Sequence, residues 1–280
     1  MSKVIISSKN FSKIKEKILG GGIENLHVLA DFDKTLTKAH VNGVPTSSII
    51  SELRNRNILS EDYQNEAKRL FSEYHPIELD HTLEPEVRDA KMKEWWIKIF
   101  DLLIKERVNL SHLKEVIEAG KIELREGVSD MLKFLRDHKI PLVILSASGI
   151  GDLIPMYLEK QGLLYKNITI VSNFFEWDSE GYARFPKPPI IHSENKGEAQ
   201  LEKLEIYKEL EKRKNVLLLG DSLGDVEMIG EFPYENLIKI GFLNEEIDKR
   251  MDAYKEIFDL IIPNDGDINF VNEFLNEFKL

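Results

Sequence analysis

The chain has 280 residues, of which 42% are hydrophobic and 31% charged, proportions typical of a folded globular protein rather than a disordered or fibrous one. Its formal net charge of -11 disfavours polyanionic partners, so we expect it to bind neither nucleic-acid polymers nor anionic membranes. It contains no cysteine, which excludes disulfides, thiolate metal sites and thiol catalysis. The sequence has neither a signal-peptide pattern nor an apolar run long enough to span a membrane, so we expect a cytoplasmic protein. The sequence leaves its oligomeric state open, and a monomer is the default expectation.

Short apolar segments with strand character recur along the chain, at residues 26–30, 141–146, 167–172, 215–220, 236–242 and 258–263. Most are continuously apolar, as expected of parallel strands that are buried on both faces. Amphipathic segments of helical length lie between them, at residues 131–138, 152–162 and 198–214. This alternation predicts an α/β fold with a doubly wound, Rossmann-like parallel sheet.

One long region interrupts the alternation. From about Thr46 to Gly120 there is no strand-like segment, and four segments carry helical spacing, at residues 50–56, 61–74, 85–107 and 110–120. We therefore predict a core domain formed by residues 1–44 and 122–280, with a helical cap domain over residues 45–121 inserted after the first predicted strand. Such a cap can overhang the carboxyl ends of the strands, where open α/β sheets bind ligands.

Acidic residues follow two of the predicted strands at the point where each strand ends. Asp31 and Asp33 follow the first strand, in DFDKTLT, and Asp221 and Asp225 follow the fourth, in GDSLGD. If these strands are adjacent, the carboxylates converge, and an oxygen-only ligand set without histidine or cysteine favours Mg²⁺. A bound cation would also offset the cost of burying the charges.

Beside such an ion, Asp31 could use one oxygen for coordination and the other to attack an electrophile. Asp33 could donate a proton to a leaving alkoxide and later activate water. The DxD pattern alone decides little, because it also fits a solvated turn, a helix cap or the metal site of a sugar transferase.

Two further segments point to a bound phosphate. Ser146 ends the second predicted strand in VILSASGIGD, where small residues let backbone N–H groups and a hydroxyl approach a phosphate. Lys196, in HSENKGEAQ, would lie at the start of the helix predicted over 198–214, where the helix dipole disfavours a cation unless an anion binds there. Taken singly, the first segment also fits a plain strand-to-helix turn and the second a solvated surface lysine.

The order of these motifs resembles that of the haloacid dehalogenase superfamily of phosphohydrolases: DFDKTLT, a strand ending in Ser146, then Lys196, then GDSLGD. From about Gly22 onwards, nearly the whole chain is similar to the cytosolic pyrimidine 5′-nucleotidase family, also called cytosolic 5′-nucleotidase III. The segments that carry this resemblance are YHPIELD, KEWW, GIGD, VSNFFEWD, HSENKGEA, GDSLGDVEM and IKIGFLNE.

The resemblance implies a role for each matching acidic residue. Asp31 would be the nucleophile and a Mg²⁺ ligand. Asp33 would be the acid and base and would give its backbone carbonyl to the metal, and Asp221 would be the third protein ligand. Asp225 would orient this cluster from behind the ligands.

The substrate contacts are implied in the same way. Ser146, the backbone of Ala147 and Lys196 would hold the transferring phosphoryl group and neutralise its charge. Glu78, in PIELD, matches a family glutamate that contacts the nucleobase, and a carboxylate can accept a hydrogen bond from the amino group of cytosine. Without a ligand, Glu78 would simply be a surface acid.

The sequence departs from the family pattern at two places. LSASGIGD has one residue more than the usual Ser-Ala-Gly-Ile-Gly-Asp, so Ser148 is extra and the phosphate loop can differ in shape. Ile99 stands where related enzymes can carry a serine near the base, which leaves the base preference open.

Other candidates are assigned to structural roles. We expect His75 and His81 in turns or on the surface, and Trp95 and Trp96 in the core of the cap, with one aromatic lining a base pocket as the alternative. SNFFEWD and the turn-like WDSEGY predict a surface hairpin.

The sequence thus predicts a Mg²⁺-dependent phosphatase for nucleoside 5′-monophosphates, pyrimidine ones such as UMP and CMP preferred, that works through an aspartyl-phosphate. The alternatives are a nucleoside phosphotransferase, a phosphatase for another small phosphomonoester, a non-catalytic nucleotide-binding module and a DxD sugar transferase. Ion-pumping ATPases are excluded, because they carry threonine where Asp33 stands.

Overall fold

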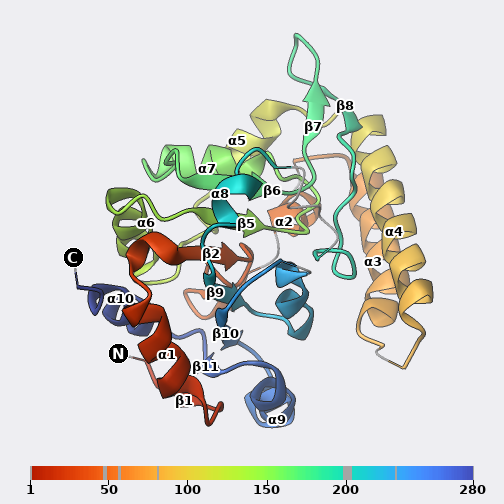
Figure 1. The fold of residues 1–280 in the computed structure, drawn as a ribbon. Coiled ribbons are helices and arrows are strands. Elements are labelled where there is room, and N and C mark those ends of the chain that lie inside the picture. The colour runs from red at the N-terminus through yellow and green to blue at the C-terminus, as the bar shows by residue number, and fades with distance from the viewer. Residues whose placement is uncertain are drawn as a thin grey trace.

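The structure is a computed structural model, and it describes residues 2–46, 49–55, 58–80, 82–197, 204–230 and 232–279. Seven strands form the central sheet in the order β1–β11–β10–β9–β2–β5–β6 (Figure 1). They are β1 (Ile5–Ile6), β2 (Leu26–Ala30), β5 (Leu142–Leu145), β6 (Ile168–Val171), β9 (Asn215–Gly220), β10 (Asn236–Leu243) and β11 (Leu260–Pro263). All neighbours pair in parallel except β1, which is antiparallel to β11. The six predicted strands are therefore confirmed, and the two-residue edge strand β1 was not predicted.

The direction in which the chain adds strands to the sheet reverses at β2. From β2 the chain continues through β5 to β6 on one side, whereas β9, β10 and β11 follow one another on the other side. The crevice between the carboxyl ends of β2 and β9 is therefore the switch point where doubly wound sheets bind ligands.

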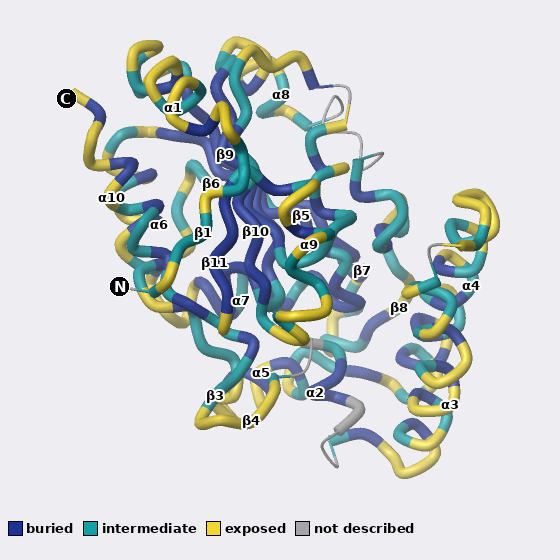
Figure 2. The backbone as a smooth tube through the Cα atoms, turned by 90° about the horizontal axis from the view of Figure 1, so that it is seen from below, coloured by how far each residue is buried: buried dark blue, intermediate teal, exposed yellow. Residues whose placement is uncertain are grey.

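Helices cover both faces of the sheet, because successive strand residues point to opposite sides. Val28 and Ala30 pack in a cluster with one set of helices, whereas Leu29 packs in a second cluster on the opposite face. The first set is α1 (Phe11–Gly20), α6 (Val128–Asp137), α7 (Leu153–Lys160) and α10 (Asn269–Asn276). The opposite face is covered by α8 (Tyr207–Leu210), the 3-10 helix η3 (Leu223–Ile229) and α9 (Ile247–Ile257). Figure 2 shows the inner strands of the sheet as the buried centre of the molecule.

Four helices lie between β2 and β5 in the chain: α2 (Ile49–Asn55), α3 (Glu61–Glu78), α4 (Pro85–Lys105) and α5 (Leu110–Glu118). The long helices α3 and α4 pack side by side, beside the carboxyl ends of the strands (Figure 1). The helical insertion is confirmed, and the division into core and cap at residues 45–121 stays a prediction. A two-strand hairpin that was not predicted, β3 (His40–Val41) with β4 (Val44–Pro45), precedes it.

The hairpin predicted around WDSEGY is present. It consists of β7 (Phe175–Trp177) and β8 (Ala183–Pro186), and Gly181 in its turn has a φ of +82°, a conformation that favours glycine. Among the described helices, none is both long and apolar enough to cross a membrane.

The long helix predicted over 198–214 is wrong for the residues that the structure describes. Residues 198–203 lie outside the described ranges, and α8 covers only Tyr207–Leu210. Leu204 and Ile206 both pack against the cluster beneath β9. Residues two apart do not share a face of a helix, so this packing favours an irregular segment over a continuous helix.

Candidate active site

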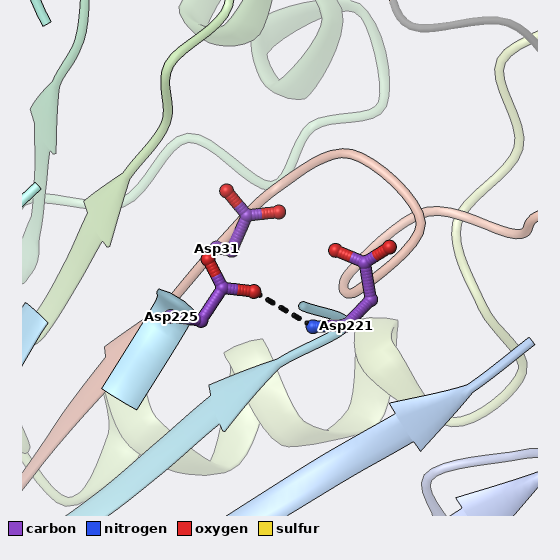
Figure 3. A group of neighbouring side chains, drawn as sticks. All are labelled: Asp31, Asp221 and Asp225. Carbon is purple, nitrogen blue, oxygen red and sulfur yellow. Dashed lines mark hydrogen bonds between the residues drawn. The ribbon is translucent and has the colours of Figure 1, made fainter. Parts of the chain in front are cut away.

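Three carboxyl groups meet at the switch point of the sheet. Asp31 directly follows β2, where its N–H donates to the carbonyl of Leu219 in β9 at 3.0 Å. Asp221 directly follows β9, and one carboxylate oxygen each from Asp31, Asp221 and Asp225 lies within 4.8 Å of the others (Figure 3). The two acidic pairs singled out in the sequence are thus brought to one edge of the sheet, as neighbouring parallel strands require.

Asp225 uses its oxygens to organise the loop after β9. Its Oδ2 accepts hydrogen bonds from the N–H groups of Asp221 and Ser222, both at 2.9 Å, and Figure 3 shows the first of these. A Cβ at Gly220 would lie 2.3 Å from the Cβ of Asp225, so this close approach requires glycine. This arrangement fits an orienting role for Asp225 better than that of a metal ligand.

Lys196 is buried inside the acidic cluster. Its Nζ lies 2.5 Å from Oδ1 of Asp31 and 2.7 Å from Oδ1 of Asp225, and the residue is only 7% exposed. A solvated surface lysine is thereby excluded. The predicted position at the start of a long helix is also wrong, because Lys196 lies in an irregular segment and α8 begins at Tyr207.

The negative charges of the cluster are only partly compensated, so a further cation would stabilise them. Burial raises the pKa of Asp31 well above its usual range, although attraction to Lys196 opposes the shift. Burial and the neighbouring charge of Asp225 raise the pKa of Asp221 to about 7. Burial opposes the charge of Lys196, but attraction to Asp225 and Asp31 outweighs it and raises the Lys196 pKa. One lysine therefore leaves the carboxylates incompletely compensated.

The cluster opens into a cavity of about 480 Å³, a volume in the range of small-molecule sites. Its walls come from the sheet edge on one side and from α2, α3 and α4 on the other. The polar end is lined by Asp31, Asp33, Lys34, Ser146, Ala147, Ser148, Ser193, Lys196, Asp221 and Ser222. The helical end is lined by Thr46, Ile50, Ser51, Tyr63, Ala67, Phe71, His75, Glu78, Trp95, Trp96 and Ile99.

The loop after β5 links the two ends of the cavity. Ser146 is held at the strand end by its N–H bond to Val171 at 3.0 Å, and its Oγ accepts from the N–H of Ser148 at 3.2 Å. The Oγ of the extra residue Ser148 is buried and has no hydrogen-bond partner among the described residues. A Cβ at Gly149 would lie 2.4 Å from the ring of Trp96, so this loop touches the helical wall directly.

The helical wall is strongly aromatic. The rings of Tyr74, Trp95, Trp96 and Phe100 follow one another nearly parallel, with centroids 5.9, 5.9 and 5.7 Å apart. The expected core role of both tryptophans is confirmed, since Trp95 is 9% exposed and Trp96 packs against the core. Both also line the cavity, so the alternative of an aromatic pocket wall holds as well.

Glu78 and His75 line the helical end of the cavity and contact each other. His75 Nδ1 lies 3.1 Å from Oε2 of Glu78, and the imidazole stacks on Phe71 with centroids 4.5 Å apart. His75 does not lie in a turn, because it belongs to the last turn of α3, but its side chain is 38% exposed and so lies at the surface as well as on the cavity wall. His81 lies outside the described residues.

Sequence reasoning missed Lys34 and Ser193 at the polar end, and Tyr63 and Phe71 on α3. The spacing of the sequence could have indicated Tyr63 and Phe71. Tyr63, Ala67, Phe71, His75 and Glu78 are spaced by three or four residues, which places them on one face of a helix.

A family model described as "Pyrimidine 5'-nucleotidase (UMPH-1)" matches residues 34–279. The chain belongs to this family. It is therefore a 5′-nucleotidase of the haloacid dehalogenase type, and its DFDKTLT segment begins at the switch point of the sheet.

Named relatives of this 5′-nucleotidase agree with the assignment. It is 35% identical over 260 residues to a "7-methylguanosine phosphate-specific 5'-nucleotidase A" from Xenopus laevis, covering 92% of this chain and 89% of that protein. It is 34% identical over 256 residues to a human "7-methylguanosine phosphate-specific 5'-nucleotidase", covering 91% of this chain and 85% of that protein.

Solved structures support the fold of the 5′-nucleotidase. A crystal structure of cytosolic 5′-nucleotidase IIIB bound to cytidine matches with a TM-score of 0.87 and 26% identity, covering 98% of this chain and 93% of that chain. A phosphoserine phosphatase in its apo form matches with a TM-score of 0.53 at 19% identity, over 89% of this chain and 97% of that one, which shows a shared fold.

Proposed function

We propose that this 5′-nucleotidase hydrolyses nucleoside 5′-monophosphates with Mg²⁺, by transferring the phosphoryl group to Asp31 and then to water. The observation that carries the proposal is the meeting of Asp31, Lys196 and Asp221 at one end of a cavity whose other end is aromatic. A nucleoside monophosphate has the same polarity, with an anionic phosphate at one end and an aromatic base at the other.

The donor set fits Mg²⁺. The oxygens of Asp31 and Asp221 are hard ligands that lie within 4.8 Å of each other, and the raised pKa values of both carboxyl groups support a site that added positive charge would stabilise. We assign Asp31, Asp221 and the backbone carbonyl of Asp33 as ligands. When bound, the ion supplies Lewis-acid stabilisation of the phosphoryl oxygens.

The chain's own residues carry the remaining steps. A carboxylate oxygen of Asp31 attacks phosphorus, and Asp33, two residues further and also lining the cavity, protonates the departing ribose 5′-oxygen. Asp33 then takes a proton from the water that attacks the aspartyl-phosphate. Ser146, the N–H of Ala147 and Lys196 hold the phosphoryl oxygens and compensate their charge.

At the other end, the nucleobase stacks against the aromatic wall and Glu78 accepts from its exocyclic amino group. The related structure with cytidine supports a pyrimidine, and CMP and UMP are therefore the first candidates. Because Glu78 can pair with the amino group of cytosine and not with the carbonyl of uracil, Glu78→Gln should lower kcat/KM for CMP more than for UMP.

A second candidate substrate is a 7-methylguanosine monophosphate. Relatives of 34–35% identity carry that specificity in their names, and the cavity combines a carboxylate with two indole rings. A methylated purine cation is attracted both to an indole face and to a carboxylate.

The direct test is phosphate release from CMP, UMP, AMP, GMP and 7-methyl-GMP, with Mg²⁺ or with a chelator, for the wild type and for Asp31→Asn. We expect release that requires Mg²⁺ and that falls by at least about a thousandfold in Asp31→Asn, the scale of losing a catalytic nucleophile. Activity that survives the substitution or ignores the chelator would falsify this mechanism.

The same panel separates the alternatives. Added nucleoside acceptors would become phosphorylated if the chain were a phosphotransferase, and turnover of non-nucleotide phosphate esters alone would indicate another phosphomonoesterase. Binding without any turnover would leave a non-catalytic nucleotide-binding module. A cytoplasmic location and a monomeric state remain predictions of the sequence.

A further inference from the structure

A buried arginine lies beside the segment that carries the catalytic aspartates. Arg125 is only 1% exposed and belongs to the stretch through which the chain returns from the helical insertion to α6. Its guanidinium lies over the ring of Phe242, with 4.3 Å between Cζ and the ring centroid, and is paired with Asp265 at 3.0 Å. Nothing in the proposed phosphoryl transfer uses this buried cation.

The guanidinium is directed at backbone carbonyls of the loop after β2. Nη2 donates to the carbonyl of Lys34 at 2.5 Å, and Nε donates to the carbonyl of Thr35 at 2.9 Å. Nη2 also lies 3.1 Å from Oδ1 of Asn244, and the Nδ2 of the same asparagine donates to the carbonyl of Lys34 at 3.0 Å. Two side chains from distant parts of the sequence therefore hold one carbonyl oxygen.

That carbonyl belongs to a residue in an unfavourable backbone conformation. Lys34 has a φ of +59°, in the left-handed region where residues with a side chain are uncommon. Such a conformation persists only where its surroundings hold it. At Lys34 the holding contacts are those of Arg125 and Asn244 on its carbonyl and of Thr37 Oγ1, which accepts from its N–H at 2.9 Å.

We infer that Arg125 and Asn244 are positioning residues that aim Asp33, the residue directly before Lys34, at the substrate oxygen that it protonates. The backbone on the other side of Asp33 is fixed as well, because the N–H of Asp31 is bonded to β9. The backbone is therefore held by the sheet two residues before Asp33, and by Arg125 and Asn244 at the residue after it. The inference depends on the proposed role of Asp33 as the acid.

The position of the Asp33 carboxyl group matters in the first half of the reaction, in which the leaving group departs. As the bond from Asp31 to phosphorus forms, the bond from phosphorus to the 5′-oxygen breaks and its electron pair stays on that oxygen. The oxygen takes the proton of Asp33, which becomes a carboxylate. A ribose alkoxide needs this proton, whereas 4-nitrophenolate is stable enough to leave without it.

The test therefore compares kcat/KM for CMP with kcat/KM for 4-nitrophenyl phosphate, since both values report only steps up to the departure of the leaving group. The first variant is Asn244→Ala, which removes one of the two side chains that contact the Lys34 carbonyl. The second is Arg125→Lys, which keeps the positive charge but loses the planar guanidinium with its several N–H donors. Arg213→Lys is the matched control. Arg213 donates to the carbonyl of Leu26 at 3.0 Å, at the opposite end of β2.

We expect Asn244→Ala and Arg125→Lys to lower the ratio of kcat/KM for CMP to kcat/KM for 4-nitrophenyl phosphate by about tenfold or more. A loss of this size is a part of what general acid catalysis usually contributes. Arg213→Lys should leave this ratio unchanged. Lys34→Gly, which removes the conformational penalty at this position, should reduce the effect of Asn244→Ala when the two are combined.

Equal losses with the two substrates, or no loss in the folded variants, would overturn the inference. If Arg125→Lys does not fold, as circular dichroism would reveal, Asn244→Ala decides alone. Failure of the proposed function would be visible separately, as a wild type that releases no phosphate from nucleotides or an Asp31→Asn that still does.

Discussion

Lys196 is the residue on which the balance of charge at the site depends. It lies between Asp31 and Asp225, in contact with both, and each partner is almost fully buried. Removing the cation from buried carboxylates strongly destabilises the folded state. The free-energy cost of dehydrating the carboxylates remains, but the attraction that compensated it is lost. The lysine therefore stabilises the fold, and in the proposed mechanism it also compensates the charge of the transferring phosphate.

Replacing this lysine tests the double role. We expect Lys196→Met to lower the free energy of unfolding by about 3 kcal/mol without metal, the scale of breaking a buried ion pair. Saturating Mg²⁺ should recover a large part of this loss, since the ion compensates the same carboxylates. The measurement is urea unfolding with Mg²⁺ and with a chelator.

The control for this experiment is Lys15→Met. Lys15 is paired with Glu277 at 2.6 Å on the surface, where an ion pair contributes little, so we expect a change below about 1 kcal/mol in either condition. A Lys196→Met variant as stable as the wild type in chelator would contradict the account of the cluster.

At the scale of elements, α4 contacts the segment that carries Lys196. Arg88 in the first turn of α4 is paired with Glu194 at 2.9 Å, and both side chains are largely buried, at 13% and 16% exposure. The neighbouring Asp89 lies 3.5 Å from Nε2 of His192. Helix α4, which lines the helical end of the cavity, therefore also contacts the segment that brings Lys196 to its polar end.

Reversing this pair should alter catalysis through Lys196. We expect Arg88→Glu to lower kcat/KM for CMP about tenfold, since two like charges would separate α4 from the segment. Combining it with Glu194→Arg should restore most of the activity. Steady-state kinetics of the two single variants and the double variant measure the coupling.

Reversal of an exposed pair is the comparison. Arg69 on α3 contacts Glu73 at 2.7 Å and is 55% exposed, so Arg69→Glu should leave kcat/KM within about twofold of the wild type. If Arg88→Glu behaves in the same way, α4 does not position Lys196.

The elements differ in how well the sequence predicts them. Strands β2 and β9 are predicted residue for residue, because short, continuously apolar segments are typical of strands buried on both faces. The edge strand β1 is too short to leave a pattern, and α8 is overpredicted because its charged surface mimics a long solvated helix. The local sequence pattern indicates which residues are buried. Where a helix gives way to an irregular segment depends on tertiary contacts, which the local pattern does not contain.

At the scale of the whole molecule, stability should depend on the ionisation of His27. This residue of β2 is fully buried, its Nδ1 donates to the carbonyl of Arg213 at 2.9 Å, and its Nε2 has no partner in the described part of the chain. Burial lowers its pKa from 6.5 to about 4. The unfolded chain therefore binds a proton on this ring at a pH where the folded chain does not.

A pH series measures this effect. The contribution of His27 is complete above pH 6.5 and is lost as the pH falls towards 4, which amounts to about 2 kcal/mol between pH 7 and pH 5. His27→Asn keeps a donor near the Nδ1 position and cannot titrate, so its unfolding free energy should change less over this interval by about that amount. Parallel pH curves for the two proteins would contradict the assignment.

The site as a whole is assembled from segments that lie far apart in the chain, and the sequence predicts it in part. The acidic pairs could be placed together because the ends of neighbouring parallel strands meet at one edge. The contact of Lys196 with Asp31 could not be derived from spacing, and neither could the clamp of Arg125 and Asn244 on Lys34. Those contacts depend on loop conformations that only the folded chain defines.

The central claim is that Asp31 carries the phosphoryl group, and chemical trapping tests it most directly. The enzyme is mixed with CMP and Mg²⁺, quenched in acid during turnover and reduced with borohydride, which converts an aspartyl-phosphate to homoserine. Mass spectrometry of the peptides then locates the modified residue. We predict homoserine at position 31 and none in enzyme treated without substrate. Modification at a different aspartate, or no modification while phosphate is steadily released, would contradict the account.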